Sequence, residues 1–152
     1  MGLSFKVQYP IRFSHCDPAG IVYFPRFFDL LHDTMEDWFT NGLGERFSEL
    51  VMGKGMGTPT VSTHCDFISP ARFGDVLTIE LSILRLGTAS VELLFQASVQ
   101  DRACFRCRHT ICLFDRTTLK AVPIPEDLRG RMQAYLAEPA SESQPVPGRN
   151  KK

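Results

Sequence analysis

One carboxylate in a turn ahead of a helix is the feature of this sequence best suited to chemistry. Asp17 lies in the segment FSHCDPAGIVYFPRFFDLL, eight residues before Pro25. Proline is favoured in the first helical turn, so we expect a helix to begin near Pro25. The first amides of a helix are unpaired and partly positive, so they can polarise a carbonyl group. A carboxylate beside such amides is suited to acyl transfer, although an Asp that merely shapes an Asp-Pro turn remains the simpler alternative.

The elements that position Asp17 follow from hydrophobic periodicity. After Pro25, apolar residues recur at steps of three and four, which predicts an amphipathic helix that ends at Asn41-Gly42. A second, shorter helix is predicted over 45–52. Apolar and polar residues alternate elsewhere, which predicts strands over 4–13, 61–67, 75–86, 88–100 and 103–114, and a short helix over 126–136.

A strand, a long helix and then consecutive antiparallel strands indicate an α+β domain with the helix packed on one sheet face. The chain of 152 residues is long enough for one domain, which we place at 1–136. The Pro- and Ser-rich segment 137–152 is predicted to be a disordered tail.

Composition excludes several classes of protein. The chain has 17 basic and 17 acidic side chains, whereas a general nucleic-acid binder normally has a basic excess. No stretch is apolar enough for a membrane helix or a signal peptide, so we expect a cytoplasmic protein.

Five cysteines, an odd number, are expected to be reduced thiols. Cys104-x-x-Cys107 lies in a predicted strand without a second cysteine pair, so we expect no metal site.

Two sequence blocks resemble the 4-hydroxybenzoyl-CoA thioesterase family of hotdog-fold proteins. The blocks are DPAGIVYFP at 17–25 and GMGTPTVSTHCDFISPARFGDVLTIE at 55–80. The resemblance implies a hotdog fold, in which an antiparallel β-sheet wraps around a long central helix. It also implies a homodimer, often assembled further into a homotetramer, with active sites at the subunit interface.

The resemblance assigns roles to residues of the first block. Asp17 matches the catalytic carboxylate, which acts as a nucleophile or as a general base on the thioester carbonyl. Backbone amides near Tyr23 and Phe24 match the groups that polarise that carbonyl, and Gly20 would allow close approach of the acyl group. No cofactor or metal is expected, because coenzyme A is part of the substrate and its thiolate is a good leaving group.

The chain departs from the family at two places. His32 stands where hydroxybenzoyl-specific relatives have a helix carboxylate that reaches the ring hydroxyl, so either a phenol-binding or a surface role is expected for it. The turn expected to hold the coenzyme phosphates offers only Arg85, with Thr88 and Ser90 as hydrogen-bonding groups. Residues 81–152 nevertheless carry eleven basic and seven acidic side chains, so a basic patch is expected there.

His64 is a further candidate because it lies in the second block. The resemblance implies that it either lines the site from the facing subunit or is an interface residue with a satisfied hydrogen bond. It alternates with its neighbours on the predicted strand and shares a face with Asp66. Arg106 and Arg108 share one face of a later strand and are expected to be surface residues.

The function expected from these observations is hydrolysis of an aromatic acyl-CoA, with hydroxybenzoyl-type thioesters as one candidate, to the free acid and CoA. A short- or branched-chain acyl-CoA is the alternative substrate. A hotdog protein that binds an acyl thioester or a protein partner without turnover is the non-enzymatic alternative. A dehydratase acting on 3-hydroxyacyl thioesters is a third, for which His64 is the only indication.

Overall fold

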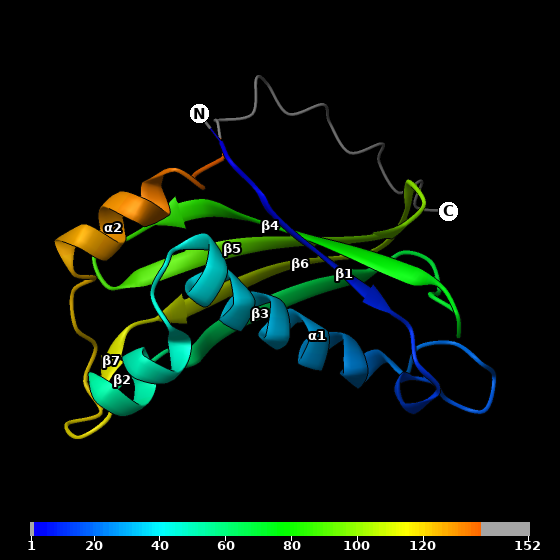
Figure 1. The fold of residues 1–152 in the computed structure, drawn as a ribbon, viewed down its shortest axis with the longest axis horizontal. Coiled ribbons are helices and arrows are strands. Elements are labelled where there is room, and N and C mark those ends of the chain that lie inside the picture. Colours follow the sequence, from blue (N-terminus) through cyan, green and yellow to red (C-terminus); the bar gives the residue numbers. More distant parts are fainter. Residues whose placement is uncertain (1, 138–152) are drawn as a thin grey trace, which may run out of the picture.

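The computed structural model describes residues 2–137 and shows one helix packed on one curved sheet (Figure 1). The sheet has five antiparallel strands in the order β1-β4-β5-β6-β3, and helix α1 covers one of its faces. The predicted α+β architecture is therefore confirmed. The strands are β1 (Phe5–Pro10), β3 (Thr60–Phe67), β4 (Val76–Leu86), β5 (Ser90–Val99) and β6 (Arg102–Cys112).

The helices and short elements surround this sheet. Helix α1 spans Phe24–Asp37 and α2 spans Glu126–Gln133. Single turns of helix lie at η1 (Phe13–His15), η2 (Trp38–Gly42) and η3 (Glu49–Gly53). A separate two-stranded sheet pairs β2 (Met56–Gly57) with β7 (Phe114–Asp115).

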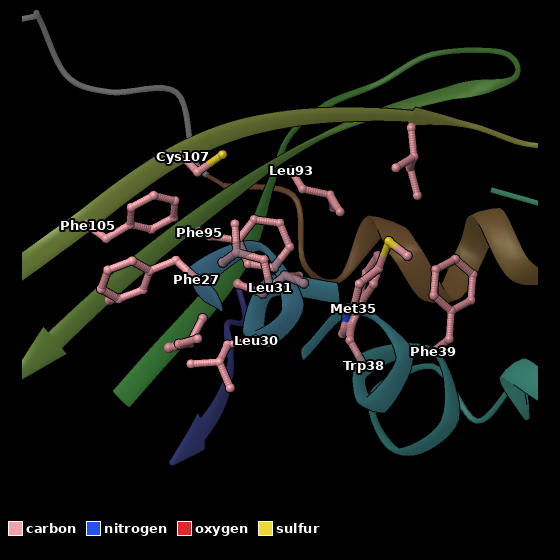
Figure 2. Close-up of a cluster of buried hydrophobic side chains, with 14 of the residues drawn as sticks. Phe27, Leu30, Leu31, Met35, Trp38, Phe39, Leu93, Phe95, Phe105 and Cys107 are labelled. Carbon is pink, nitrogen blue, oxygen red and sulfur yellow. The ribbon is translucent and has the colours of Figure 1, made fainter. Parts of the chain in front are cut away.

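The sheet and the helix pack against each other through the apolar residues that the sequence periodicity placed on one face of each element. In β4, Leu77, Ile79 and Leu81 are fully buried, while the residues between them are only half-buried. Side chains alternate along a strand, so these residues all point at α1. Figure 2 shows the resulting core, in which the ring of Phe27 on α1 stacks on Phe105 of β6 at 5.1 Å.

The two faces of the sheet differ in character. We call the face packed against α1 the helix side and the other face the open side. The open side carries exposed polar groups on neighbouring strands: His64 of β3 is opposite Arg108 of β6, and Asp66 is opposite Arg106. The prediction that both arginines are surface residues is confirmed, because both are exposed.

Several predicted boundaries shift by a few residues. The first strand ends at Pro10 and not at residue 13, because the chain turns into η1. The helix predicted over 45–52 is found over residues 47–53, and its last part is the π-helical segment η3, which ends at Gly53. The last strand divides at residue 113 between β6 and β7, and α2 ends at Gln133. Residues 138–152 of the predicted disordered tail lie outside the described residues.

Candidate active site

Asp17 lies in a tight turn that is closed by its own backbone. Its N–H donates to the carbonyl of Ile21 at 2.9 Å, and its carbonyl accepts the N–H of Gly20 at 3.0 Å. Its Oδ1 accepts the N–H of Ala19 at 2.8 Å. The side chain is half-buried. The turn therefore holds the carboxylate in one direction, which is what a catalytic group requires.

A distant segment anchors this turn. The N–H of Val22 donates to the carbonyl of Ala71, and the N–H of Phe73 donates to the carbonyl of Gly20. Residues 71–73 connect β3 to β4, so both sequence blocks meet here. Gly20 has φ +78°, and no atom lies within 4 Å of the position that a Cβ would occupy. A side chain would be strained there, and the space beside Gly20 is open.

The start of α1 contributes one free amide. The Tyr23 N–H donates to the carbonyl of His15 at 2.9 Å, so it cannot also polarise a carbonyl group without losing that bond. This corrects the expected role of Tyr23. The Phe24 N–H has no hydrogen-bond acceptor among residues 2–137, as expected for the first residue of a helix. Phe24 is therefore the stronger candidate for the polarising amide.

Asp17 lines a shallow cavity of about 470 Å³. The other lining residues are Phe13, Cys16, Pro18, Gly20 and Phe73. The thiol of Cys16 is the other potential nucleophile in this cavity. Burial and then the charge of Asp17 raise the pKa of Cys16 above its ordinary value. A protonated thiol is a poor nucleophile, so the carboxylate is the better candidate.

His32 lies in a second cavity, between α1 and the sheet. This cavity measures about 360 Å³, within the range of small-molecule sites. The helix contributes Phe28, Asp29, Leu31, His32 and Met35, and the sheet side contributes Thr58, Thr60, Thr63, Phe95 and His109. The walls are thus largely apolar, with hydroxyl, imidazole and carboxylate groups on them.

His109 is a residue of this cavity that the sequence reasoning did not select. Its Nε2 lies 3.3 Å from Oγ1 of Thr60, and its ring packs edge-on against Phe95. Its Nδ1 is enclosed and has no partner within residues 2–137. An enclosed nitrogen without a partner costs about 1–3 kcal/mol. Burial, followed by the charge of His32, lowers the pKa of His109 below its ordinary value.

The structure does not bring His64 to either cavity. His64 lies on the open side of the sheet, with its Nε2 3.9 Å from Oδ1 of Asp66. It borders a small hollow of about 160 Å³ together with Ser62, Glu92, Arg108 and Thr110. Asp17 belongs to a different cavity. The predicted role of His64 within the substrate site therefore gains no support from its placement.

The predicted phosphate-binding turn lies far from Asp17 within one chain. Strand β4 begins near the Asp17 turn, because the Ile11 N–H donates a hydrogen bond to the carbonyl of Asp75, the residue before the strand. From there the strand runs about 30 Å to Arg85. The Gly87 N–H donates to the carbonyl of Ser90 and closes the turn. Thr88 and Arg85 are exposed there, as a phosphate site requires.

Arg129 of α2 is a second residue that the sequence reasoning missed. Its guanidinium donates to the carbonyls of Gly87 and Thr88, so it holds the turn in place. It adds a second cation beside Arg85 at this end of the sheet. No sequence signal pointed to it, because the contact joins residues about forty positions apart.

The described part of the chain has neither a metal-binding cluster nor a helix suited to span a membrane. No three His, Cys, Asp or Glu side chains converge on a common point within residues 2–137. None of the helices in that range combines the length and the apolar character needed to cross a bilayer. All five cysteines are free thiols.

Comparison with known proteins settles the family. The model of the thioesterase-like superfamily matches residues 11–132. The chain belongs to this superfamily. The resemblance inferred from the two sequence blocks is thereby confirmed, and with it the hotdog fold and the class of thioester hydrolases.

Individual relatives agree with this assignment. The chain is 38% identical to a 4-hydroxybenzoyl-CoA thioesterase of Pseudomonas sp. (strain CBS-3) over 84 residues, which is 55% of this chain and 60% of that protein. It is 27% identical to a 1,4-dihydroxy-2-naphthoyl-CoA hydrolase of Acaryochloris marina over 123 residues, or 78% of this chain and 88% of that protein.

A solved structure is similar over most of both chains. It is the D17N mutant of a 4-hydroxybenzoyl-CoA thioesterase complexed with 4-hydroxybenzoyl-CoA. The TM-score is 0.78 at 26% identity, and the match covers 85% of this chain and 98% of that chain. A gentisyl-coenzyme A thioesterase matches with a TM-score of 0.76 at 26% identity over 84% of this chain and 99% of that one.

Proposed function

We propose that this protein hydrolyses an aromatic acyl-CoA thioester to the free acid and CoA. The observation that carries the proposal is Asp17, held in a rigid turn directly ahead of α1 in a chain of the thioesterase-like superfamily. Three relatives support an aromatic acyl group, since their names specify hydroxybenzoyl, dihydroxynaphthoyl and gentisyl thioesters. A relative crystallised with its thioester as an Asp-to-Asn mutant supports a carboxylate in the reaction.

The proposed mechanism follows from the carboxylate and the helix start. Asp17 attacks the thioester carbonyl carbon, or it removes a proton from a water molecule that attacks there. The Phe24 N–H donates to the carbonyl oxygen as negative charge develops on it. The carbon–sulfur bond then breaks and the thiolate of CoA leaves. When Asp17 acts as a base, the attacking water supplies the new oxygen of the acid. When Asp17 is the nucleophile, water hydrolyses the acyl–aspartyl anhydride, which releases the acid and restores the carboxylate. This chemistry requires neither a metal nor a cofactor.

We also propose that the complete site forms between two copies of the chain. His32 lies eight residues into α1 from Phe24, about 12 Å along the helix, so one chain separates the Asp17 turn from the cavity beside α1. Strand β3 is an edge strand with exposed Val61 and Phe67. An unpaired edge of this kind favours pairing with another strand.

Two-fold pairing of these edges would join the separated groups. Antiparallel strands place the Thr60 end of one β3 beside the Phe67 end of the other. Thr60 lines the α1 cavity, whereas Phe67 packs on Phe24 at the start of α1. The cavity of each copy would then face the partner's Asp17. A homotetramer of two such dimers stays a prediction.

The phosphate groups of CoA are assigned to the turn between β4 and β5, with Arg85, Thr88 and Ser90 as ligands. Arg129 supports this assignment, because it orders the turn and adds positive charge beside it. A cytoplasmic location, where acyl-CoA substrates and reduced thiols coexist, is part of the same proposal.

The test of the reaction is thiol release from a panel of aromatic and aliphatic acyl-CoAs. Asp17→Asn keeps the size of the side chain and its bond to the Ala19 N–H. We expect a fall in kcat of about 10²- to 10⁴-fold. Undiminished turnover in this variant would contradict the mechanism, and efficient turnover of aliphatic thioesters alone would favour a short- or branched-chain substrate.

The test of the shared site is complementation by mixing. Asp17→Asn lacks the carboxylate, and His32→Trp fills the cavity from an exposed position on α1. If each site takes one group from each copy, an equal mixture of the two inactive variants regains about a quarter of wild-type activity, because half of the dimers are mixed and each of these has one intact site. Sites built within single chains would regain none. The same measurement reports on a binding protein without turnover, which would release no thiol in any sample.

A further inference from the structure

The Asp17 turn is only as rigid as the loop that anchors it. Two backbone hydrogen bonds and an isolated β-bridge between Ile21 and Arg72 attach the turn to residues 69–75. These residues connect β3 to β4 and belong to neither a strand nor a helix. Connecting loops are more mobile than the elements they join. The direction of the carboxylate therefore depends on what fixes this loop to the rest of the fold.

Arg102, the first residue of β6, reaches the loop from another part of the chain. Its Nη1 donates to the carbonyl of Pro70 and to Oγ of Ser69, both at 2.7 Å. Its Nη2 lies 3.9 Å from Oδ2 of Asp75. A guanidinium presents several N–H groups in one plane, so a single side chain contacts both the beginning and the end of the loop.

Other contacts fix the two ends of the loop. At the first end, the Ser69 N–H donates to the carbonyl of Cys104 on β6 at 3.3 Å. At the second end, Oδ2 of Asp75 accepts the N–H of Arg72 at 2.8 Å. The contact of Arg102 with the carbonyl at residue 70 lies between these ends, directly before the residue that binds the turn ahead of α1.

We propose that Arg102 is a positioning residue for the reaction, which fixes residues 69–75 and through them the direction of the Asp17 carboxylate. The inference rests on the proposed function. Its path crosses two contacts, from the guanidinium to the loop and from the Ala71 carbonyl to the Val22 N–H. Loss of the guanidinium should lower kcat, because a displacement of about 1 Å at a reacting group reduces the rate by about 100-fold.

A cation in this region has an alternative role, which is contact with the phosphates of CoA. Two observations argue against that role. The guanidinium of Arg102 is already engaged by acceptors of its own chain, and the turn assigned to the phosphates lies at the other end of β4. A phosphate ligand would raise KM for CoA thioesters alone, whereas a positioning residue acts on kcat whatever the leaving group. Kinetics therefore separates the two roles.

The kinetic experiment uses two thioesters of 4-hydroxybenzoate, one with CoA and one with N-acetylcysteamine, which has no phosphate. Arg102→Ala should lower kcat about 10- to 100-fold for both thioesters, with little change in KM. Arg102→Lys keeps a cation that donates hydrogen bonds but loses the planar fork, so its kcat should lie between those of Arg102→Ala and wild type. The Arg102 side chain is 45% exposed, so its removal leaves no buried cavity and both variants should fold.

Arg116→Ala is the matched control. The Arg116 guanidinium also donates to a loop carbonyl, that of Val51, at 2.9 Å. Arg116 follows β7, which lies at the opposite end of the molecule from the turn ahead of α1 (Figure 1). Its loss should leave kcat unchanged. Unchanged kcat in Arg102→Ala, or a rise in KM confined to the CoA thioester, overturns the positioning role.

Amide hydrogen exchange tests the anchoring without turnover. Peptides that cover residues 17–24 and 69–75 should exchange about tenfold faster in Arg102→Ala than in wild type, while peptides of β5 and all peptides of these regions in Arg116→Ala stay unchanged. Unchanged exchange in both regions of Arg102→Ala overturns the anchoring. Wild type that releases no thiol from any thioester overturns the proposed function and the kinetic role together, and the exchange rates still decide whether Arg102 holds the turn.

Discussion

His64 and His109 occupy neighbouring strands and nearly the same register, yet their surroundings are opposite. Thr63 of β3 is paired with His109 of β6, and the next residue, His64, is paired with Arg108. The side chain of His64 is 68% exposed on the open side. The ring of His109 borders the cavity under α1. One step along a strand moves a side chain to the other face, so strand parity, more than residue type, decides which histidine can contact a substrate.

The largest expected difference in stability is between two substitutions at adjacent residues, one on the helix side of the sheet and one on the open side. Phe105 is 1% exposed and stacks on Phe27, whereas Arg106, the next residue, is exposed on the open side. Phe105→Ala should lower the free energy of unfolding by about 3–5 kcal/mol through lost burial and a residual cavity. Arg106→Ala should change it by about 0.5 kcal/mol or less.

Urea unfolding of both variants at one protein concentration measures this difference, because self-association would add to the apparent stability. Equal losses in the two variants would mean that the open side is covered by another surface. The open side would then no longer be the solvent-exposed face of the sheet.

A change of pH should have a smaller effect on the free energy of unfolding, and this effect should come from His109 on the helix side of the sheet. The pKa of His109 is lowered in the folded protein, mainly by burial, so the unfolded chain binds a proton there at higher pH than the folded chain does. The stability contributed by the neutral imidazole is complete above about pH 6.5, the ordinary value for histidine, and is lost as the pH falls below it.

The free energy of unfolding, measured from pH 7.5 to pH 5, should therefore decline less steeply in His109→Leu than in wild type. His32 contributes to the same trend, because its positive charge opposes protonation of His109. Parallel curves for the two proteins would show that His109 takes up its proton as readily in the folded state as in the unfolded one.

The smallest effect is expected for His64→Ala. Its nearest charged neighbour on its own strand is Asp66, at 3.9 Å, and both side chains are about two-thirds exposed. Surface pairs of this kind contribute about 0–1 kcal/mol. We expect kcat/KM to change less than about twofold, since this face lies away from Asp17. A loss of activity comparable to that of Asp17→Asn would restore His64 to the site, through a facing subunit.

Much of the fold could be predicted because the patterns are local. The helical repeat that includes Phe27 and Leu30 and the alternation of Leu77 and Ile79 report directly which side of each element is apolar. The Asp17 turn was also accessible, since Asp-Pro and a glycine specify a turn within a few residues. Boundaries were less accurate, because Pro10 and residue 113 end strands only where the tertiary path bends.

The site was predicted only in part, for a physical reason. The Tyr23 amide is occupied by the His15 carbonyl, a bond that depends on how η1 folds back on the helix start. Arg129 reaches the turn at Gly87 only after α2 has packed against the sheet. Neither contact has a sequence signature, because side chains from distant segments meet only in the folded chain.

The sequence by itself determined the α+β architecture, the position of the long helix and the turn that holds Asp17, since each of these depends on neighbouring residues. The tertiary structure decided which residues share a site. The pairing of the Asp17 turn with residues 71–73 and the burial of His109 under α1 are non-local. They arise from packing free energy, which depends on all of the contacting segments together and not on any one of them.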